Sequence, residues 1–193
     1  MLSSTMDARS QADPAHGPTP GLITALDHQR MASLARWTAR TLATAHPVPF
    51  AAEIVHSTTG ERLMRALNAV AVQNDPSAHA ELRTVRRAGR KLGSYSLRGY
   101  TLYSTCEPCP MCMANALWAD LDRIVYGATI DDANRFCRQI RIPAREVVER
   151  SDMSSTIVTG PVCRDACLAI FTHPKMQETF KTWSTAREAT AAT

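Results

Sequence analysis

Residues 100–128 read YTLYSTCEPCPMCMANALWADLDRIVYGA, and the fold is easiest to infer from this stretch. Residues 100–105 alternate and are rich in β-branched and aromatic side chains, which predicts a strand. Pro108 suits the first turn of a helix, and we expect this helix to continue through Trp118. Residues 123–128 predict a second strand. A strand, a helix and a strand in this order are typical of an α/β domain.

The flanking sequence continues this alternation. Apolar residues recur every three or four positions over residues 22–45, which predicts a helix. Two apolar runs surround a turn that contains Gly60, a pattern typical of a hairpin. Elsewhere we expect helices over residues 78–91, 108–118, 131–136 and 162–171, and strands over residues 49–55, 62–72, 100–105, 123–128 and 155–158.

Length and composition indicate one globular domain. The chain has 193 residues, of which 45% are apolar and 21% are charged, which excludes a disordered or fibrous protein. Residues 1–21 are rich in Ser, Thr, Pro, Gly and Asp, and we expect a disordered arm there. We expect the folded domain to cover residues 22–173. Residues 174–193 show no strong pattern and are expected to form a C-terminal tail.

The compartment is also predicted from composition. No apolar run reaches the roughly 18 residues that a membrane-spanning helix needs, and the N-terminus has no apolar signal segment. We therefore expect a cytoplasmic protein with no membrane partner. In that reducing compartment, six cysteines indicate metal ligands, catalytic groups or core residues in preference to disulfides. The net charge of +4 is too small to indicate a nucleic-acid partner by itself.

Two short motifs at predicted helix starts bring metal-ligand residue types together. His79 begins one helix, and Cys109 and Cys112 lie in a C-x-x-C pair at the start of another. A helix N-terminus lowers the pKa of a thiol and so favours the thiolate that binds metal. One imidazole and two thiolates are ligands that Zn²⁺ prefers, and three protein ligands leave a fourth position open for water. The sequence thus predicts a catalytic zinc site.

Glu81 is the candidate catalytic residue. It lies two residues after His79, where its carboxylate could approach the open position. Zinc lowers the pKa of a bound water to roughly 7, and a neighbouring carboxylate can take that proton and pass it on.

A closed, structural zinc site is the competing interpretation. Cys106 lies close enough in sequence to Cys109 and Cys112 to serve as a fourth ligand beside His79. The protein would then be a zinc-stabilised interaction domain rather than an enzyme. A structural site has no use for Glu81, so this residue favours the catalytic interpretation.

The joint motif resembles the zinc-dependent cytidine and deoxycytidylate deaminase superfamily. Residues 74–88 (NDPSAHAELRTVRRA) and 102–128 are most similar to its guanine deaminase branch. The resemblance runs from about Pro49 to Ala133 and more weakly to Phe171. It implies a three-layer α/β/α sandwich with a central mixed sheet, usually assembled at least as a dimer, so we expect a homodimer.

The resemblance also implies a function. The expected reaction is hydrolytic, zinc-dependent deamination of a small nucleobase-like heterocycle, with release of ammonia. Asn68 falls where family members place an amide that holds the substrate ring. Phe50 and Trp118 fall where aromatic side chains line the base pocket, and Ala80 is a further expected substrate-binding position. The backbone amide of Cys109 or its neighbour would contact an oxygen of the substrate.

The substrate itself is left open because the sequence departs from the family pattern. Guanine deaminases carry an acidic residue that reads guanine in the segment after a DA pair. Here residues 131–133 read DDA and residues 134–140 read NRFCRQI, which supply no acid at that place. Arg135, Arg138 or Gln139 could face a different edge of a heterocycle. Phe180 and Trp183 are weak matches to the C-terminal aromatic of some relatives.

Editing of adenosine to inosine in transfer RNA is the alternative function. RNA-editing members share both zinc motifs, and they need a basic surface. A basic stripe runs along the helix predicted over residues 78–91, although such a stripe is more often a solvated helix face. It consists of Arg83, Arg86, Arg87, Arg90 and Lys91. The small net charge argues against a nucleic-acid partner without excluding one.

Overall fold

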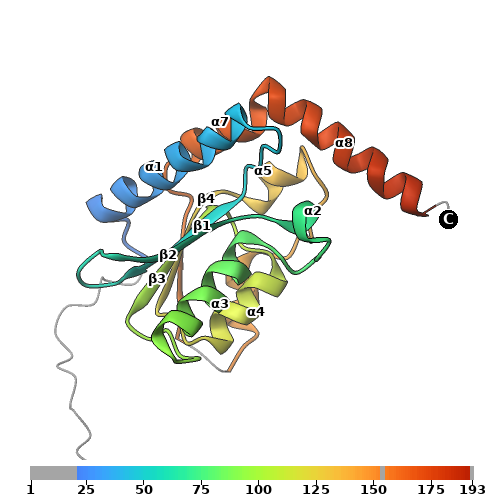
Figure 1. The fold of residues 1–193 in the computed structure, drawn as a ribbon. Coiled ribbons are helices and arrows are strands. Elements are labelled where there is room, and N and C mark those ends of the chain that lie inside the picture. The colour runs from blue at the N-terminus through green and yellow to red at the C-terminus, as the bar shows by residue number, and fades with distance from the viewer. Residues whose placement is uncertain (1–20, 153–154, 192–193) are drawn as a thin grey trace, which may run out of the picture.

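The computed structural model describes residues 21–152 and 155–191, and residues 1–20 of the predicted arm lie outside this part. Its centre is a mixed five-stranded sheet in the order β2-β1-β3-β4-β5 (Figure 1). β1 pairs antiparallel with both β2 and β3, whereas β3, β4 and β5 run parallel. The strands are β1 (Ala51–His56), β2 (Arg62–Leu67), β3 (Tyr100–Cys106), β4 (Arg123–Ala128) and β5 (Ile157–Thr159).

Helices cover both faces of the sheet, so the predicted three-layer α/β/α sandwich with a mixed sheet is confirmed (Figure 1). α3 (Ala80–Leu92) and α4 (Pro110–Trp118) pack on one face. α1 (Ala25–Ala39) and α7 (Arg164–Thr172) pack on the other. The remaining helical segments are η1 (Arg40–Ala43), α2 (Val70–Gln73), α5 (Ile130–Asn134), α6 (Ala144–Glu149) and α8 (Pro174–Ala191).

Alternation along the strands builds two separate hydrophobic cores. Successive side chains of a strand point to opposite faces, so neighbouring apolar residues serve different layers. In β3, Leu102 packs towards α3 and α4, whereas Tyr103 packs towards α1 and α7. Ile124 and Val125 divide in the same way in β4. This arrangement explains why the central strands are apolar on both faces.

Three predicted regions differ from the structure. The apolar run of residues 62–72 is not one strand: β2 ends at Leu67, and residues 70–73 form helix α2. The short helix α6 has no counterpart among the predicted elements. The segment after residue 173, in which no pattern stood out, forms the 18-residue helix α8. The predicted domain boundaries themselves stay a prediction.

A buried ion pair fastens α1 to the sheet. Arg123 of β4 donates to both carboxylate oxygens of Asp27, at 2.8 and 3.0 Å, and the Tyr103 hydroxyl donates to the same carboxylate at 2.8 Å. Burial alone would raise the pKa of Asp27, but hydrogen bonds from Arg123, Thr24 and Tyr103 lower it below its usual value. The carboxylate therefore stays charged, and it joins the first helix to two central strands.

No helix in the described part of the chain is long and apolar enough to cross a membrane.

Removing Arg123 should strongly destabilise the fold. We expect Arg123→Met to lower the free energy of unfolding by roughly 3–5 kcal/mol, because it leaves the Asp27 carboxylate buried without its counter-ion. Urea unfolding followed by circular dichroism measures this loss. The matched control is Arg98→Met, which breaks an exposed pair with Asp120 at 4.0 Å and should cost at most about 1 kcal/mol. Equal effects of the two variants would contradict a special role for the buried pair.

Candidate metal centre and substrate cavity

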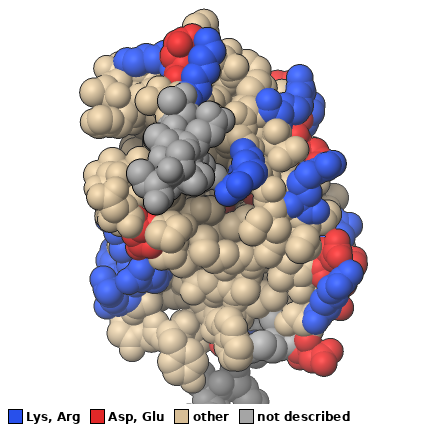
Figure 2. Space-filling view, turned by 90° about the vertical axis from the view of Figure 1, so that its right-hand side faces the viewer, with Lys and Arg blue, Asp and Glu red and all other residues tan. Residues whose placement is uncertain are grey.

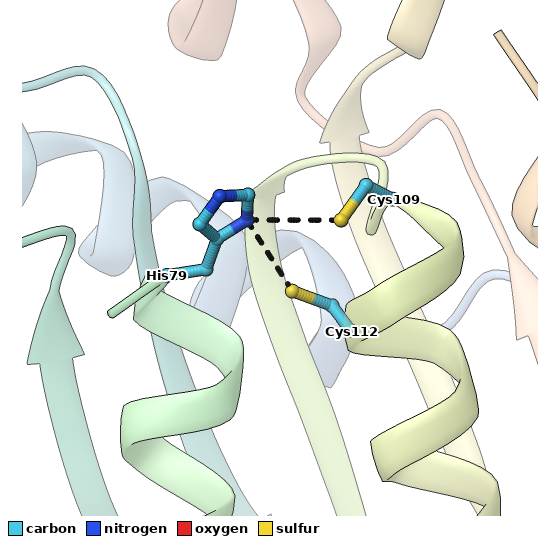
Figure 3. Close-up of side chains that lie close together, drawn as sticks. All are labelled: His79, Cys109 and Cys112. Carbon is cyan, nitrogen blue, oxygen red and sulfur yellow. Dashed lines mark hydrogen bonds between the residues drawn. The ribbon is translucent and has the colours of Figure 1, made fainter. Parts of the chain in front are cut away.

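His79 and Cys109 occupy equivalent positions in two helices. His79 is the N-cap residue of α3, and Cys109 is the N-cap residue of α4. Cys112 lies in the first turn of α4, where Pro110 supplies a favourable helix start. Figure 3 shows the three side chains pointing towards one another from the ends of the two helices. The two motifs that are far apart in the sequence therefore meet at one point.

The spacing of these donors fits a tetrahedral zinc ion. His79 Nδ1 lies 3.5 Å from the Sγ atom of Cys112 and 3.7 Å from that of Cys109 (Figure 3). All three donor atoms lie within 4.8 Å of one another. Zinc–nitrogen and zinc–sulfur bonds of about 2.0 and 2.3 Å place tetrahedral N and S ligands roughly 3.5 Å apart. One imidazole and two sulfurs are also a donor set that zinc prefers, so the residues fit the ion.

Local electrostatics favour the thiolate form of Cys109. A hydrogen bond from Cys112, joined by one from His79, lowers the pKa of Cys109 to about 4 against the opposing effect of burial. Cys109 also lies at the positive N-terminal end of α4, which stabilises negative charge. A metal ligand must be deprotonated to bind, so this environment prepares Cys109 for that role.

Glu81 lies beside the three donors in the first turn of α3. Its side chain is buried and lines the same cavity as His79 and Cys109. The Ser104 hydroxyl donates to its Oε1 atom at 3.3 Å. Burial raises the pKa of Glu81, while His79 opposes this shift. A raised pKa makes a carboxyl group easier to protonate, which suits a group that accepts and returns a proton.

Cys106 is held apart from this cluster. Among residues 21–152 and 155–191, the group of donors close enough to share a metal ion contains His79, Cys109 and Cys112 without Cys106. The Cys106 thiol is directed to the carbonyl oxygen of Thr129 at 3.8 Å, and burial raises its pKa well above the usual range. The arrangement is thus a three-donor centre, as the catalytic interpretation requires.

A cavity of about 500 Å³ opens beside the metal centre. This volume lies within the range of small-molecule sites. Phe50 packs edge-on against Phe171 with ring centroids 5.3 Å apart, and Phe136 and Phe180 stack at 6.0 Å. Phe50, Phe136 and Phe180 thus supply an aromatic part of the wall. The lining residues are Phe50, Asn68, Val70, Ala71, Pro76, His79, Glu81, Cys106, Glu107, Cys109, Phe136, Cys137, Arg138, Gln139, Phe180, Trp183 and Ser184.

The predicted substrate-binding residues divide into two groups. Asn68 and Phe50 line the cavity. Ala80 is fully buried beneath it and is not part of its wall. Trp118 is 67% exposed and borders a separate hollow that contains Ile142. Trp118 therefore does not line this cavity within one chain: six residues of α4 at about 1.5 Å each place it roughly 9 Å from Cys112.

Several cavity residues were missed or undervalued by the sequence analysis. Glu107 lines the cavity, and its two carboxylate oxygens accept the backbone N–H groups of Ile130 and Ala144 at 3.0 and 2.9 Å. It thereby positions the segment that carries Phe136 and Arg138. Ser104 contacts Glu81, but its place in an alternating strand gave no functional signal. Phe180 and Trp183, noted only as weak matches, reach the cavity from α8.

Comparison with known proteins agrees with this arrangement. Residues 25–128, more than half of the chain, match the family described as the cytidine and deoxycytidylate deaminase zinc-binding region. Guanine deaminase of Bacillus subtilis (strain 168) is 42% identical over 85 residues, covering 44% of this chain and 53% of that protein. A tRNA-specific adenosine deaminase of the same strain is 38% identical over 81 residues, covering 42% of this chain and 49% of that protein. The chain spans about half the length of these curated relatives.

Solved structures show a likeness of fold. Guanine deaminase from Nitrosomonas europaea superimposes with a TM-score of 0.68 at 21% sequence identity, covering 86% of this chain and 89% of that chain. A structure described in a study of A-to-I editing by tRNA:A34 deaminases superimposes with a TM-score of 0.61 at 28% identity, covering 74% and 99%.

Zinc content should distinguish the three-donor centre from a closed four-ligand site. We expect about one zinc ion per purified chain, because three protein ligands suffice for a catalytic site. His79→Ala and Cys112→Ser should lose most of this zinc, whereas the control Cys106→Ser should retain it. Inductively coupled plasma mass spectrometry gives the metal content, with circular dichroism to verify folding. Loss of zinc from folded Cys106→Ser protein would instead support four ligands.

Proposed function

We propose, from the premise that this chain belongs to the family of cytidine and deoxycytidylate deaminase zinc-binding regions, that it catalyses hydrolytic deamination of a small nucleobase-like heterocycle. The observation that carries this proposal is the position of Glu81 in the wall of one cavity with His79 and Cys109. A structural zinc site needs no buried carboxylate beside its ligands. A hydrolytic site needs a group that moves protons.

The proposed reaction replaces an amino group by a carbonyl oxygen. When bound by His79, Cys109 and Cys112, zinc supplies polarisation of a water molecule and lowers its pKa to about 7. Glu81 accepts one proton as the water oxygen adds to the amine-bearing carbon and delivers it to a ring nitrogen. It then takes the remaining proton from the added hydroxyl group and delivers it to the leaving amine. The carbon–nitrogen bond then breaks, ammonia leaves and the carbonyl remains. Ser104 orients the Glu81 carboxyl group through its hydrogen bond.

The cavity walls suit a flat ring. Phe50, Phe136 and Phe180 present aromatic faces and edges on one side of the space, and aromatic pairs favour stacked or edge-on contacts. The Asn68 amide adds one donor and one acceptor for the edge of the substrate. These features support a heterocyclic substrate held with its amino group towards Glu81.

Adenosine-to-inosine editing of transfer RNA is the second candidate. It is favoured by an exposed cationic face on α3, formed by Arg86, Arg87, Arg90 and Lys91. None of these four side chains forms an ion pair with a residue in the described ranges, so their charge is available to phosphates. The tRNA-specific relatives point the same way. The flipped base would occupy the same cavity.

Ammonia release by zinc-loaded protein tests the proposed function. The panel contains guanine, cytosine, adenine, their nucleosides, triazines, pterins and a transfer-RNA anticodon stem. We expect turnover of a small heterocycle, and we expect Glu81→Gln to lower kcat by roughly 10²–10⁴-fold because proton transfer is lost. Zinc content should not change.

The exposed variant Glu149→Gln is the matched control and should keep full activity. Turnover of the RNA stem alone would support the editing alternative. Full activity of Glu81→Gln, or no turnover of any compound by zinc-loaded protein, would contradict the proposal.

We also propose that the protein is a homodimer. Met111 and Trp118 of α4 are exposed, as is Ile142 in the neighbouring segment, with exposed fractions of 36%, 67% and 40%. The lower centre of the face seen in Figure 2 is largely uncharged, whereas Lys and Arg lie along its edges and in its upper middle. Exposed apolar residues that lie together commonly mark an association surface.

Multi-angle light scattering should give about twice the 21.2 kDa mass of one chain. We expect Trp118→Glu to shift the protein towards the monomer, because a charge would have to be buried at the interface. The control is Tyr95→Glu, which alters a side chain that is 87% exposed elsewhere and should leave the mass unchanged. A monomeric wild-type protein would contradict this expectation.

A further inference from the structure

The charged residues that line the cavity differ in whether they already have a role or hydrogen-bond partners. Apart from thiols, four lining residues carry titratable or charged side chains: His79, Glu81, Glu107 and Arg138. His79 is a metal donor, and Glu81 is the proton carrier beside it. Both oxygens of Glu107 accept backbone N–H groups, from Ile130 and Ala144, and are thereby occupied. Of these four residues, Arg138 is the one left without a role.

Arg138 belongs to a segment without acidic residues. Residues 136–142 read FCRQIRI, so no carboxylate next to Arg138 in the chain can neutralise it. The nearby Asp131 pairs with Arg141 at 3.1 Å. Arg138 forms no ion pair with a residue in the part of the chain that the structure describes. Its guanidinium thus adds to the cavity wall a positive charge that no ion pair with a described residue engages.

The position of Arg138 is at the open side of the cavity. Its side chain is exposed, whereas Glu81 is 6% exposed. A ring held with its amino group towards Glu81 therefore presents a different part of the molecule to Arg138. A cavity of about 500 Å³ has room for a ring with a substituent.

We propose that Arg138 selects substrates that carry a negatively charged group, a carboxylate or a phosphate, on the part of the heterocycle remote from the reacting amine. This inference rests on the proposed function and names its substrate class. A guanidinium offers a planar fork of donors that matches both anions in a bidentate manner. Neutral heterocycles bind without this contact and are turned over less efficiently.

Matched pairs of compounds test this selection. The carboxylate pair is pterin with pterin-6-carboxylate. The phosphate pairs are guanosine with its 5′-monophosphate and deoxycytidine with its 5′-monophosphate. In at least one pair, we expect kcat/KM to be about tenfold higher for the charged member, mostly through KM, since the contact exists in both ground and transition states. The pair that shows this preference identifies which anion is recognised.

Variants of Arg138 separate its contribution from that of the cavity as a whole. Arg138→Gln should remove the preference and leave turnover of the neutral member within about twofold of wild type. Arg138→Lys should keep part of the preference, because it retains the charge but not the fork. Arg141→Gln is the control, since Arg141 is exposed and paired with Asp131, and it should change neither member. Raised salt should weaken the preference in every protein that shows it, and it should have no such effect in Arg138→Gln.

A binding measurement keeps this inference separate from the proposed function. Isothermal titration of zinc-loaded Glu81→Gln protein with each pair needs no turnover. Tighter binding of a charged member, lost when Arg138→Gln is added, would support the inference even if no compound were deaminated. Equal affinities within every pair, or a preference that survives Arg138→Gln, would overturn it. Ammonia release without any charge preference would overturn the inference and leave the proposed function standing.

Discussion

The convergence of two helix N-termini is the constraint on which the site depends. Along the chain, α3 precedes β3 and α4 follows it. Both helices run antiparallel to this strand, so the N-terminus of each helix lies near the carboxyl end of β3. His79 and Cys109 are the N-cap residues at these two starts. Their donor atoms therefore meet without a long loop, and the positive ends of both helices favour thiolate charge there. Moving either helix by one turn, about 5.4 Å, would separate the donors.

The cavity depends on the other layer of the sandwich as well. The buried Asp27–Arg123 pair fastens α1 to the sheet, and α1 packs against α7. Phe171 of α7 is fully buried and contacts Phe50 and Phe180, which line the cavity. The helices on one face thus supply the donors and the proton carrier, whereas the helices on the other face support the aromatic wall. The contacts of Phe171 with Phe50 and Phe180 thus link the packing of α1 and α7 on the sheet to the shape of the cavity.

The proton carrier and the proposed selectivity residue differ in burial, since Glu81 is buried and Arg138 is exposed. Glu81 lies with the metal donors, where low solvent access strengthens polar contacts. Arg138 lies on a segment that Glu107 fixes through two backbone N–H groups. A substitution in this segment can change which substrates bind without disturbing the donors.

The sequence by itself determined the alternation of strands and helices, and it determined the residue types of the metal centre, because periodicity and helix-start signals are local. The sequence could not predict α8, because the apolar residues of this segment form no clear helical stripe. Phe180 and Trp183 acquire a place only in the folded chain, where they line the cavity. Likewise, an aromatic residue such as Trp118 is typical of a base pocket, but the rise of α4 places it away from the metal donors, where its side chain is exposed. The tertiary structure decided which of Cys106, Cys109 and Cys112 share a centre with His79, because only packing fixes where side chains from separate elements meet.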